Sequence, residues 1–258
     1  MIARQGVIMN IEWNAGDYHK NFSFVYKYGE ELLNLFTLQK GARVADVGCG
    51  SAVLTKELRG AGYDVCGIDS STQMIELAKN NAPDIPFICA DATQFRLEEP
   101  VDGIFSNAVF HWIDDHEALA ENLARNLRAG GELVCEFGGK GCAEAVHSAL
   151  EDIFKAHGLE YKRTFNFKSI GEFASVLERH SLVPVYCTLF PRPTRQQGED
   201  GLKNWIFTFL KEPFSAVPEG EREQIIAEAE RDLRPMLYKD GEWYIDYVRI
   251  RVKAIKVQ

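Results

Sequence analysis

Two carboxylates flank a glycine turn, and this feature constrains the fold of the chain more than any other. A short apolar run at residues 44–47 contains Asp46 and leads into Gly48 and Gly50, and a second short run ends at Asp69. The spacing predicts a strand, a turn, a helix and a second strand. Glycines let a ligand lie against the backbone, and an acid at the end of the second strand can accept hydrogen bonds from ribose hydroxyls. The pattern predicts a nucleoside-bearing ligand at the carboxyl ends of a parallel sheet.

The residues around the turn argue against a pyrophosphate cofactor. Dinucleotide sites usually carry a third glycine, where this chain has Val53. A carboxylate at Asp46 would repel a phosphate but suits a cationic amino acid. The D-x-G-x-G pattern resembles the first motif of the class I S-adenosylmethionine-dependent methyltransferases, although Ser51-Ala52 replaces the usual Thr-Gly or Pro-Gly.

The resemblance covers about residues 40–140, which we interpret as the cofactor-binding core of a single methyltransferase domain over residues 1–258. It implies an α/β, Rossmann-like, seven-stranded sheet whose last strand runs antiparallel between the fifth and sixth. The connection between strands six and seven is much longer than usual. Residues 191–240 are therefore expected to form a helical cap, with a helix pair on the sheet as the alternative. Residues 10–36 are expected to form an N-terminal lid.

Several short segments favour one group within this superfamily. The chain is similar to the trans-aconitate methyltransferase group and to the wider methyltransferase type 11 group. The segments that carry the similarity are Trp13-Asn14, Gly67-Ile68-Asp69-Ser70-Ser71, Ala90-Asp91, Phe105-Ser106-Asn107-Ala108, His111-Trp112 and Asp114-Asp115-His116. The spacing of Ser70 and Gln73 also predicts a capping box at the start of the next helix.

The resemblance implies that S-adenosylmethionine is the cofactor and S-adenosylhomocysteine the product. The residues expected to contact the cofactor are Tyr18, His19, Asp46, Gly48, Gly50, Asp69, Ser70, Met74, Asp91, Ala92 and Asn107. Two alternatives stay open: Tyr18 and His19 would be exposed if the lid is an ordinary helix, and Asp91 would cap its own loop.

The sequence says less about the residues that contact the methyl acceptor. His111, Trp112, Arg192, Arg195 and Trp205 are expected to contact the methyl acceptor, and His111 is the candidate catalytic residue. A carboxylate acceptor needs no general base, but an arginine would orient it well. A hydroxyl or amine acceptor would need His111 as a base. The alternative is that the two arginines are ordinary solvated side chains.

Composition limits the partners. A formal net charge of −9 makes the chain a poor non-specific nucleic-acid binder. No apolar run approaches a membrane span, and no signal peptide is recognised. The six cysteines and six histidines show no metal-ligand spacing, so we expect reduced thiols, no metal, a cytoplasmic location and a monomer or homodimer.

The sequence thus predicts an S-adenosylmethionine-dependent methyltransferase of a small molecule, with O-methylation of a carboxylate as the favoured reaction. Transfer to nitrogen, sulfur or carbon of a natural-product-like acceptor is the alternative. A non-catalytic S-adenosylmethionine-binding protein is the third interpretation.

Overall fold

The computed structural model describes residues 31–258. Tyr18, His19 and most of the lid expected at residues 10–36 lie outside the described residues. The described part begins with three helical residues, 31–33.

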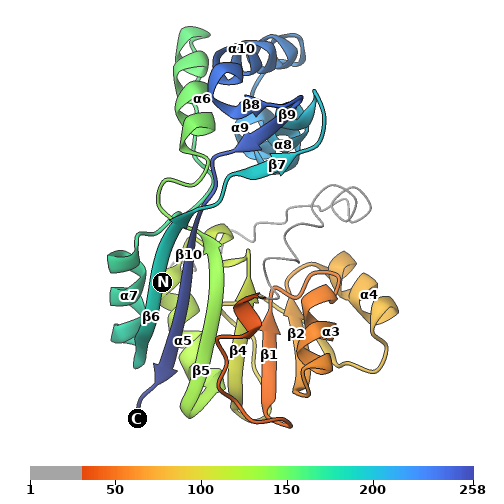
Figure 1. The fold of residues 1–258 in the computed structure, drawn as a ribbon, viewed down its shortest axis with the longest axis vertical. Helices are drawn as coiled ribbons and strands as arrows, with labels where there is room; N and C mark the ends of the chain where they lie inside the picture. The colour runs from red at the N-terminus through yellow and green to blue at the C-terminus, as the bar shows by residue number, and fades with distance from the viewer. Residues whose placement is uncertain (1–30) are drawn as a thin grey trace, which may run out of the picture.

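A mixed seven-stranded sheet forms the centre of the lower part of the molecule (Figure 1). Its order is β3-β2-β1-β4-β5-β10-β6. Only β10 runs antiparallel to its neighbours, and it lies between β5 and β6. The expected fold class, including the position and direction of the last strand, is confirmed. The strands are β1 (Arg43–Val47), β2 (Asp64–Asp69), β3 (Phe87–Cys89), β4 (Val101–Asn107), β5 (Leu127–Gly138), β6 (Leu182–Pro191) and β10 (Val248–Lys256).

Helices cover both faces of this sheet, which gives three layers. Helices α5 (His116–Asn126) and α7 (Ile170–Arg179) pack through Leu123 and Phe173 on one face. Helix α3 (Val53–Gly60) packs on the other face, beside residues 31–38. Helix α4 (Thr72–Asn81) follows β2. The apolar stripe of each helix faces the sheet, so the helices cover its two faces. The carboxyl ends of the parallel strands lie together at one edge, which these helices do not cover.

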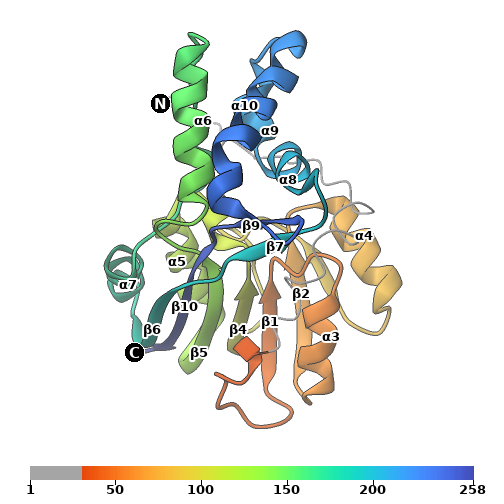
Figure 2. The ribbon, with the colours of Figure 1, turned by 45° about the horizontal axis from the view of Figure 1, so that its top comes forward.

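A second unit, here called the cap, stands above that edge (Figures 1 and 2). Its helices and the small sheet β7-β9-β8 share a hydrophobic core separate from that of the main sheet. Its elements are α6 (Glu144–Ala156), β7 (Thr194–Gln196), α8 (Gly201–Phe209), α9 (Lys211–Ser215), α10 (Glu219–Leu237), β8 (Tyr238–Lys239) and β9 (Glu242–Ile245). Helix α6 comes from between β5 and α7, so the cap draws on more of the chain than one insertion.

Four connections join the cap to the sheet unit and place it over the strand ends. They follow β5, run from α6 to α7, follow β6 and precede β10. Backbone hydrogen bonds tie them together: the Arg192 N–H donates to the Tyr247 carbonyl at 2.6 Å, and the Ala143 N–H donates to the Asp246 carbonyl at 3.0 Å.

Side-chain caps mark the starts of α7 and α4. Ser169 and Glu172 form a capping box at the start of α7. The capping box predicted at Ser70 and Gln73 is wrong, because α4 begins one residue later. Its N-cap is Ser71, whose hydroxyl accepts a hydrogen bond from the Met74 N–H at 3.3 Å.

Candidate active site

The glycine turn between β1 and α3 leaves open space beside the backbone at Gly50. Gly50 has φ +51°, and a Cβ placed on it would meet no atom within 4 Å. A Cβ on Gly48 would lie 2.1 Å from Val109 Cγ2, so no side chain fits there. Ala52 adopts the left-handed conformation with φ +67°, in the place where the usual motif has glycine. The left-handed conformation costs alanine about 1 kcal/mol. Contacts with the neighbouring residues must offset this cost for the turn to keep its geometry.

Asp69 closes the turn from the neighbouring strand. Its Oδ2 accepts the Gly50 N–H at 3.0 Å, and its Oδ1 accepts the Ser71 N–H at 2.9 Å. Burial raises the pKa of this carboxyl, while the two N–H groups oppose the rise. Each carboxylate oxygen retains acceptor capacity for one further hydrogen bond. The open Cα of Gly50 and this carboxylate therefore fit a ribose diol.

Asp46 lies beneath the turn and is almost completely buried. Its Oδ2 accepts the Thr55 hydroxyl at 2.6 Å. Burial raises the pKa of Asp46 to about 7, although the Thr55 hydrogen bond acts in the opposite direction. A carboxyl group in this state favours a nearby cation, because the cation would compensate the charge that burial penalises.

Three more residues expected at the cofactor lie around the ends of β2 and β3. Ser70 accepts a weak hydrogen bond from the Cys89 thiol through its carbonyl, and Met74 is buried in the first turn of α4. Asp91 is exposed and accepts the backbone N–H of Thr93 at 2.7 Å. Asp91 therefore caps its own loop, a role compatible with a further contact from its side chain.

Two others lie nearer the middle of the sheet. Ala92 is partly buried against the main core. Asn107 is the last residue of β4, is 8% exposed and lies opposite Glu136 of β5. The chain turns sharply after it, since Ala108 has φ +61° and donates its N–H to the Glu136 carbonyl at 2.7 Å.

His111 lies just beyond this turn, in the short 3-10 helix η1 (Phe110–Trp112). Its Nδ1 accepts the Gly138 N–H at 3.3 Å. Burial lowers the pKa of His111 well below the usual value, and the positive charge of Arg249 lowers it further. The imidazole is therefore neutral, and the tautomer inferred from this hydrogen bond carries its proton on Nε2.

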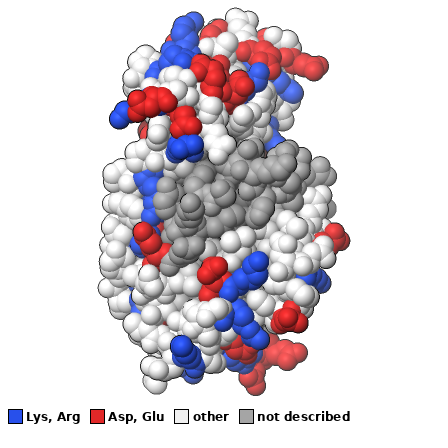
Figure 3. All heavy atoms as spheres, turned by 45° about the vertical axis from the view of Figure 1, so that its right-hand side comes forward, with Lys and Arg blue, Asp and Glu red and all other residues white. Residues whose placement is uncertain are grey.

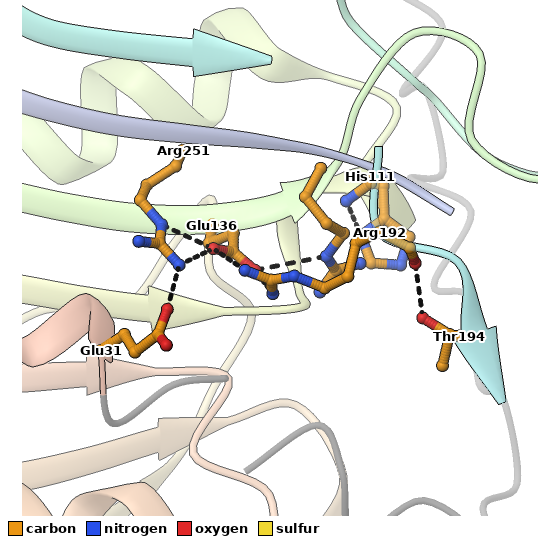
Figure 4. A network of polar contacts seen from close by, with 8 residues as sticks. Glu31, His111, Glu136, Arg192, Thr194 and Arg251 are labelled. Atoms are coloured by element: carbon orange, nitrogen blue, oxygen red, sulfur yellow. Dashed lines mark hydrogen bonds and ion pairs between the residues drawn. The ribbon is translucent and has the colours of Figure 1, made fainter. Parts of the chain in front are cut away.

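Three guanidinium groups converge on one buried carboxylate beside His111 (Figure 4). Glu136 is fully buried and forms ion pairs with Arg192 at 2.5 Å, Arg251 at 2.7 Å and Arg249 at 3.5 Å. We call Arg192, Arg249 and Arg251 the arginine cluster. Their side chains are only 9–12% exposed. Arg251 also lies 3.7 Å from the largely exposed Glu31.

Among the described residues, the carboxylates that pair with the arginine cluster are Glu136, which contacts all three guanidinium groups, and Glu31, which lies near Arg251. Burial lowers the pKa of Arg192, and the Glu136 carboxylate opposes this shift. Buried positive charge favours a nearby anion, because the anion offsets the cost of burying that charge. Planar forked donors suit a carboxylate.

The other two residues expected at the acceptor lie within the cap. Arg195 is on β7, more than half exposed, and pairs with Glu242 at 2.6 Å. Trp205 is 2% exposed in the cap core, and its indole N–H donates to the Tyr247 hydroxyl at 2.6 Å. Thus His111 and Arg192 lie together at the strand ends, whereas Arg195 and Trp205 make their contacts inside the cap.

Sequence reasoning missed Glu136, Arg249 and Arg251. A usable signal was present: Arg249 and Arg251 lie on one face of the last strand, and Glu136 lies on the fifth. The antiparallel pairing of these two strands sets Arg251 directly opposite Glu136.

The face shown in Figure 3 carries Lys and Arg interspersed with Asp and Glu over both the sheet unit and the cap. Among residues 31–258, no cluster of three or more histidine, cysteine or acidic side chains could hold a metal ion. No helix in the same residues is long and apolar enough to cross a membrane. All six cysteines are free thiols.

Known proteins share this architecture and sequence pattern. The family described as methyltransferase domain matches residues 45–135. A methyltransferase of Schizosaccharomyces pombe is 31% identical over 95% of this chain and 98% of its own length. A trans-aconitate 2-methyltransferase of Rhizobium etli is 28% identical over 95% of this chain and 99% of its own length.

Solved structures agree on the fold. The match to a putative methyltransferase from Bacillus halodurans has a TM-score of 0.64 at 14% identity and covers 90% of this chain and all of that one. The match to geranyl diphosphate C-methyltransferase from Streptomyces coelicolor, solved with S-adenosyl-L-homocysteine, has a TM-score of 0.56 at 17% identity and covers 90% of this chain and 80% of that one. The cofactor is therefore S-adenosylmethionine, and this chain belongs to the class I S-adenosylmethionine-dependent methyltransferases, in the group that contains the trans-aconitate methyltransferases.

Proposed function

We propose that the enzyme O-methylates a carboxylate of a small acid that carries more than one anionic group. The arginine cluster carries this proposal, because its three buried guanidinium groups lie beside the strand end where Asn107 and His111 lie. The full-length similarity to trans-aconitate 2-methyltransferases supports the same acceptor chemistry.

The cofactor would be held by the turn between β1 and α3. Asp69 would accept the ribose hydroxyls, the bare Gly50 would allow close approach, and Asp46 would face the cationic amino-acid end. Met74, Asp91 and Asn107 are proposed as further contacts. When bound, S-adenosylmethionine supplies a methyl group on a sulfonium centre.

The protein's contribution to the reaction would be positioning. A carboxylate is ionised at neutral pH, so the protein does not have to remove a proton from it. The arginine cluster would hold one acidic group and leave another pointing at the methyl donor. The methylated group becomes a neutral ester, and fixed alignment supplies most of the rate enhancement.

His111 is better suited to donate a hydrogen bond than to act as a base. Its Nδ1 lone pair already accepts the Gly138 N–H, and its pKa is lowered by burial. The Nε2–H could donate to an acceptor oxygen, but this tautomer offers no free lone pair for a proton. This state of His111 favours an anionic acceptor over a hydroxyl or amine.

Labelled methyl transfer tests the acceptor atom. With methyl-labelled S-adenosylmethionine and a panel of di- and tricarboxylic acids that includes trans-aconitate, we expect label in a product that is released by mild base. A methyl ester hydrolyses under these conditions, whereas an N-, S- or C-methyl group does not. Base-stable label would reject carboxylate methylation, and a panel of amines and phenols is the control.

The pH dependence of cofactor binding tests Asp46. Because the pKa of Asp46 is about 7 in the free protein, the carboxyl is about 10% ionised at pH 6 and about 90% at pH 8. The α-ammonium group of the ligand favours the ionised form of Asp46, so affinity for S-adenosylhomocysteine should rise about tenfold between these values. Isothermal titration calorimetry measures this rise.

Asp46→Asn is the control for that titration, since any ionisation of the ligand itself remains in the variant. The variant should bind more weakly at pH 8 and show a flatter pH profile than the unaltered protein. Equal slopes for both proteins would remove Asp46 from the cofactor site.

A further inference from the structure

A group of partly exposed aromatic side chains spans the junction between sheet and cap, next to His111. We call Trp112, Phe165, Phe167 and Phe209 the aromatic surface. Trp112 and Phe165 meet edge to face at 4.7 Å between centroids, Phe165 and Phe167 stack at 5.2 Å, and Trp112 lies 6.2 Å from Phe209. None of the four is fully buried.

The aromatic surface is built from three separate segments. Trp112 comes from η1, Phe209 from α8 of the cap, and Phe165 and Phe167 from the connection between α6 and α7. Asn166 fixes that connection on η1. Its N–H donates to the His111 carbonyl at 2.9 Å, and its side-chain amide donates to the Asp114 carbonyl at 3.0 Å. The two phenyl rings on either side of Asn166 are thereby held in place.

His111 joins the aromatic surface to the arginine cluster. Its ring lies 5.7 Å from Phe165 and 5.9 Å from Phe167, and the latter pair is stacked. The positive charge of Arg249 acts on the same imidazole and lowers its pKa. The strand edge therefore presents an anion-binding end and an apolar end that meet at one residue.

We propose that the acceptor carries an apolar substituent of several carbons, which packs on the aromatic surface while its acidic groups bind the arginine cluster. This inference rests on the proposed carboxylate methylation and adds a second determinant of specificity. Aromatic rings that remain partly exposed at a junction gain free energy by covering an apolar group. A polycarboxylate without such a group would use only the charged end.

A matched series of 2-alkylsuccinates, from methyl to hexyl, tests the proposal against unsubstituted succinate. The value of kcat/KM should rise two- to fourfold for each added methylene until the surface is covered. In Phe165→Ala this increment should fall below about 1.5-fold per methylene. Binding of S-adenosylhomocysteine to the variant, measured by calorimetry, reports that it is folded.

Phe207→Ala is the control, because Phe207 lies on the exposed side of α8 and contacts Lys203 instead. It should keep the full chain-length increment. Methylation of the succinates with no increase along the series would overturn this inference and leave carboxylate methylation standing. An increase that Phe165→Ala leaves unchanged would equally overturn it. If no acid in the series and no tricarboxylate is methylated, the proposed function fails and this inference with it.

Discussion

Replacing Asp69 with alanine is expected to weaken S-adenosylhomocysteine binding at least 100-fold. The carboxylate would lose two hydrogen bonds to ribose hydroxyls, and hydrogen bonds to a charged group contribute about 1.5–3 kcal/mol each. The variant also removes the acceptor that holds the Gly50 and Ser71 N–H groups at 3.0 and 2.9 Å, which loosens the turn. Isothermal titration calorimetry measures the affinity. The ligand-induced rise in melting temperature should disappear with it.

Asp64→Ala is a matched control from the other end of the same strand. Asp64 is exposed and pairs only weakly with Arg59 at 3.4 Å, so its loss should leave binding intact. Asp69→Asn should bind with intermediate affinity, since one oxygen acceptor remains without the charge. An Asp69→Ala variant that binds within a few-fold of the unaltered protein would remove Asp69 from the ribose role.

The elements around Asp69 were predictable because their signals are local. Each parallel strand from β1 to β4 is a short apolar run, and it is followed by a turn or helix start within a few residues. Even there, the helix start was placed one residue early, at Ser70 instead of Ser71. Adjacent serines offer equivalent caps, and only the backbone conformation decides between them.

The proposed acceptor site was less predictable because it depends on contacts between distant parts of the chain. Helix α6 joins the cap through packing on α10, although it precedes strand β6 in the sequence. The arginine cluster needs the ends of β5, β6 and β10 to meet, and no local pattern specifies that meeting. Arg192 is a candidate from the sequence because it lies at the start of the long connection. Its partner Glu136 has no such signal, because a single acid in an apolar strand has no local signature.

Replacing Glu136 with glutamine is expected to destabilise the protein by about 3–5 kcal/mol. The carboxylate is fully buried and pairs with all three members of the arginine cluster. Removing one partner of a buried ion pair leaves the other charge uncompensated, and here three charges would lose their common partner. Glutamine has the same shape, so the loss reports charge more than packing. Unfolding in urea, followed by circular dichroism, measures the change.

Two further carboxylates make this a graded series. Glu132 is also buried, but its ion-pair partner is a single lysine, Lys253, at 3.1 Å. Glu99 is exposed and forms an ion pair with Arg43 at 2.7 Å. Glu132→Gln should therefore cost less than Glu136→Gln, and Glu99→Gln should cost under about 1 kcal/mol, as exposed pairs do. Equal stability of all three variants would mean that the arginine cluster is not charged and buried as described. If the proposed acceptor site is correct, a tricarboxylate should raise the melting temperature of Glu136→Gln more than that of Glu132→Gln, because the anion would replace the missing carboxylate.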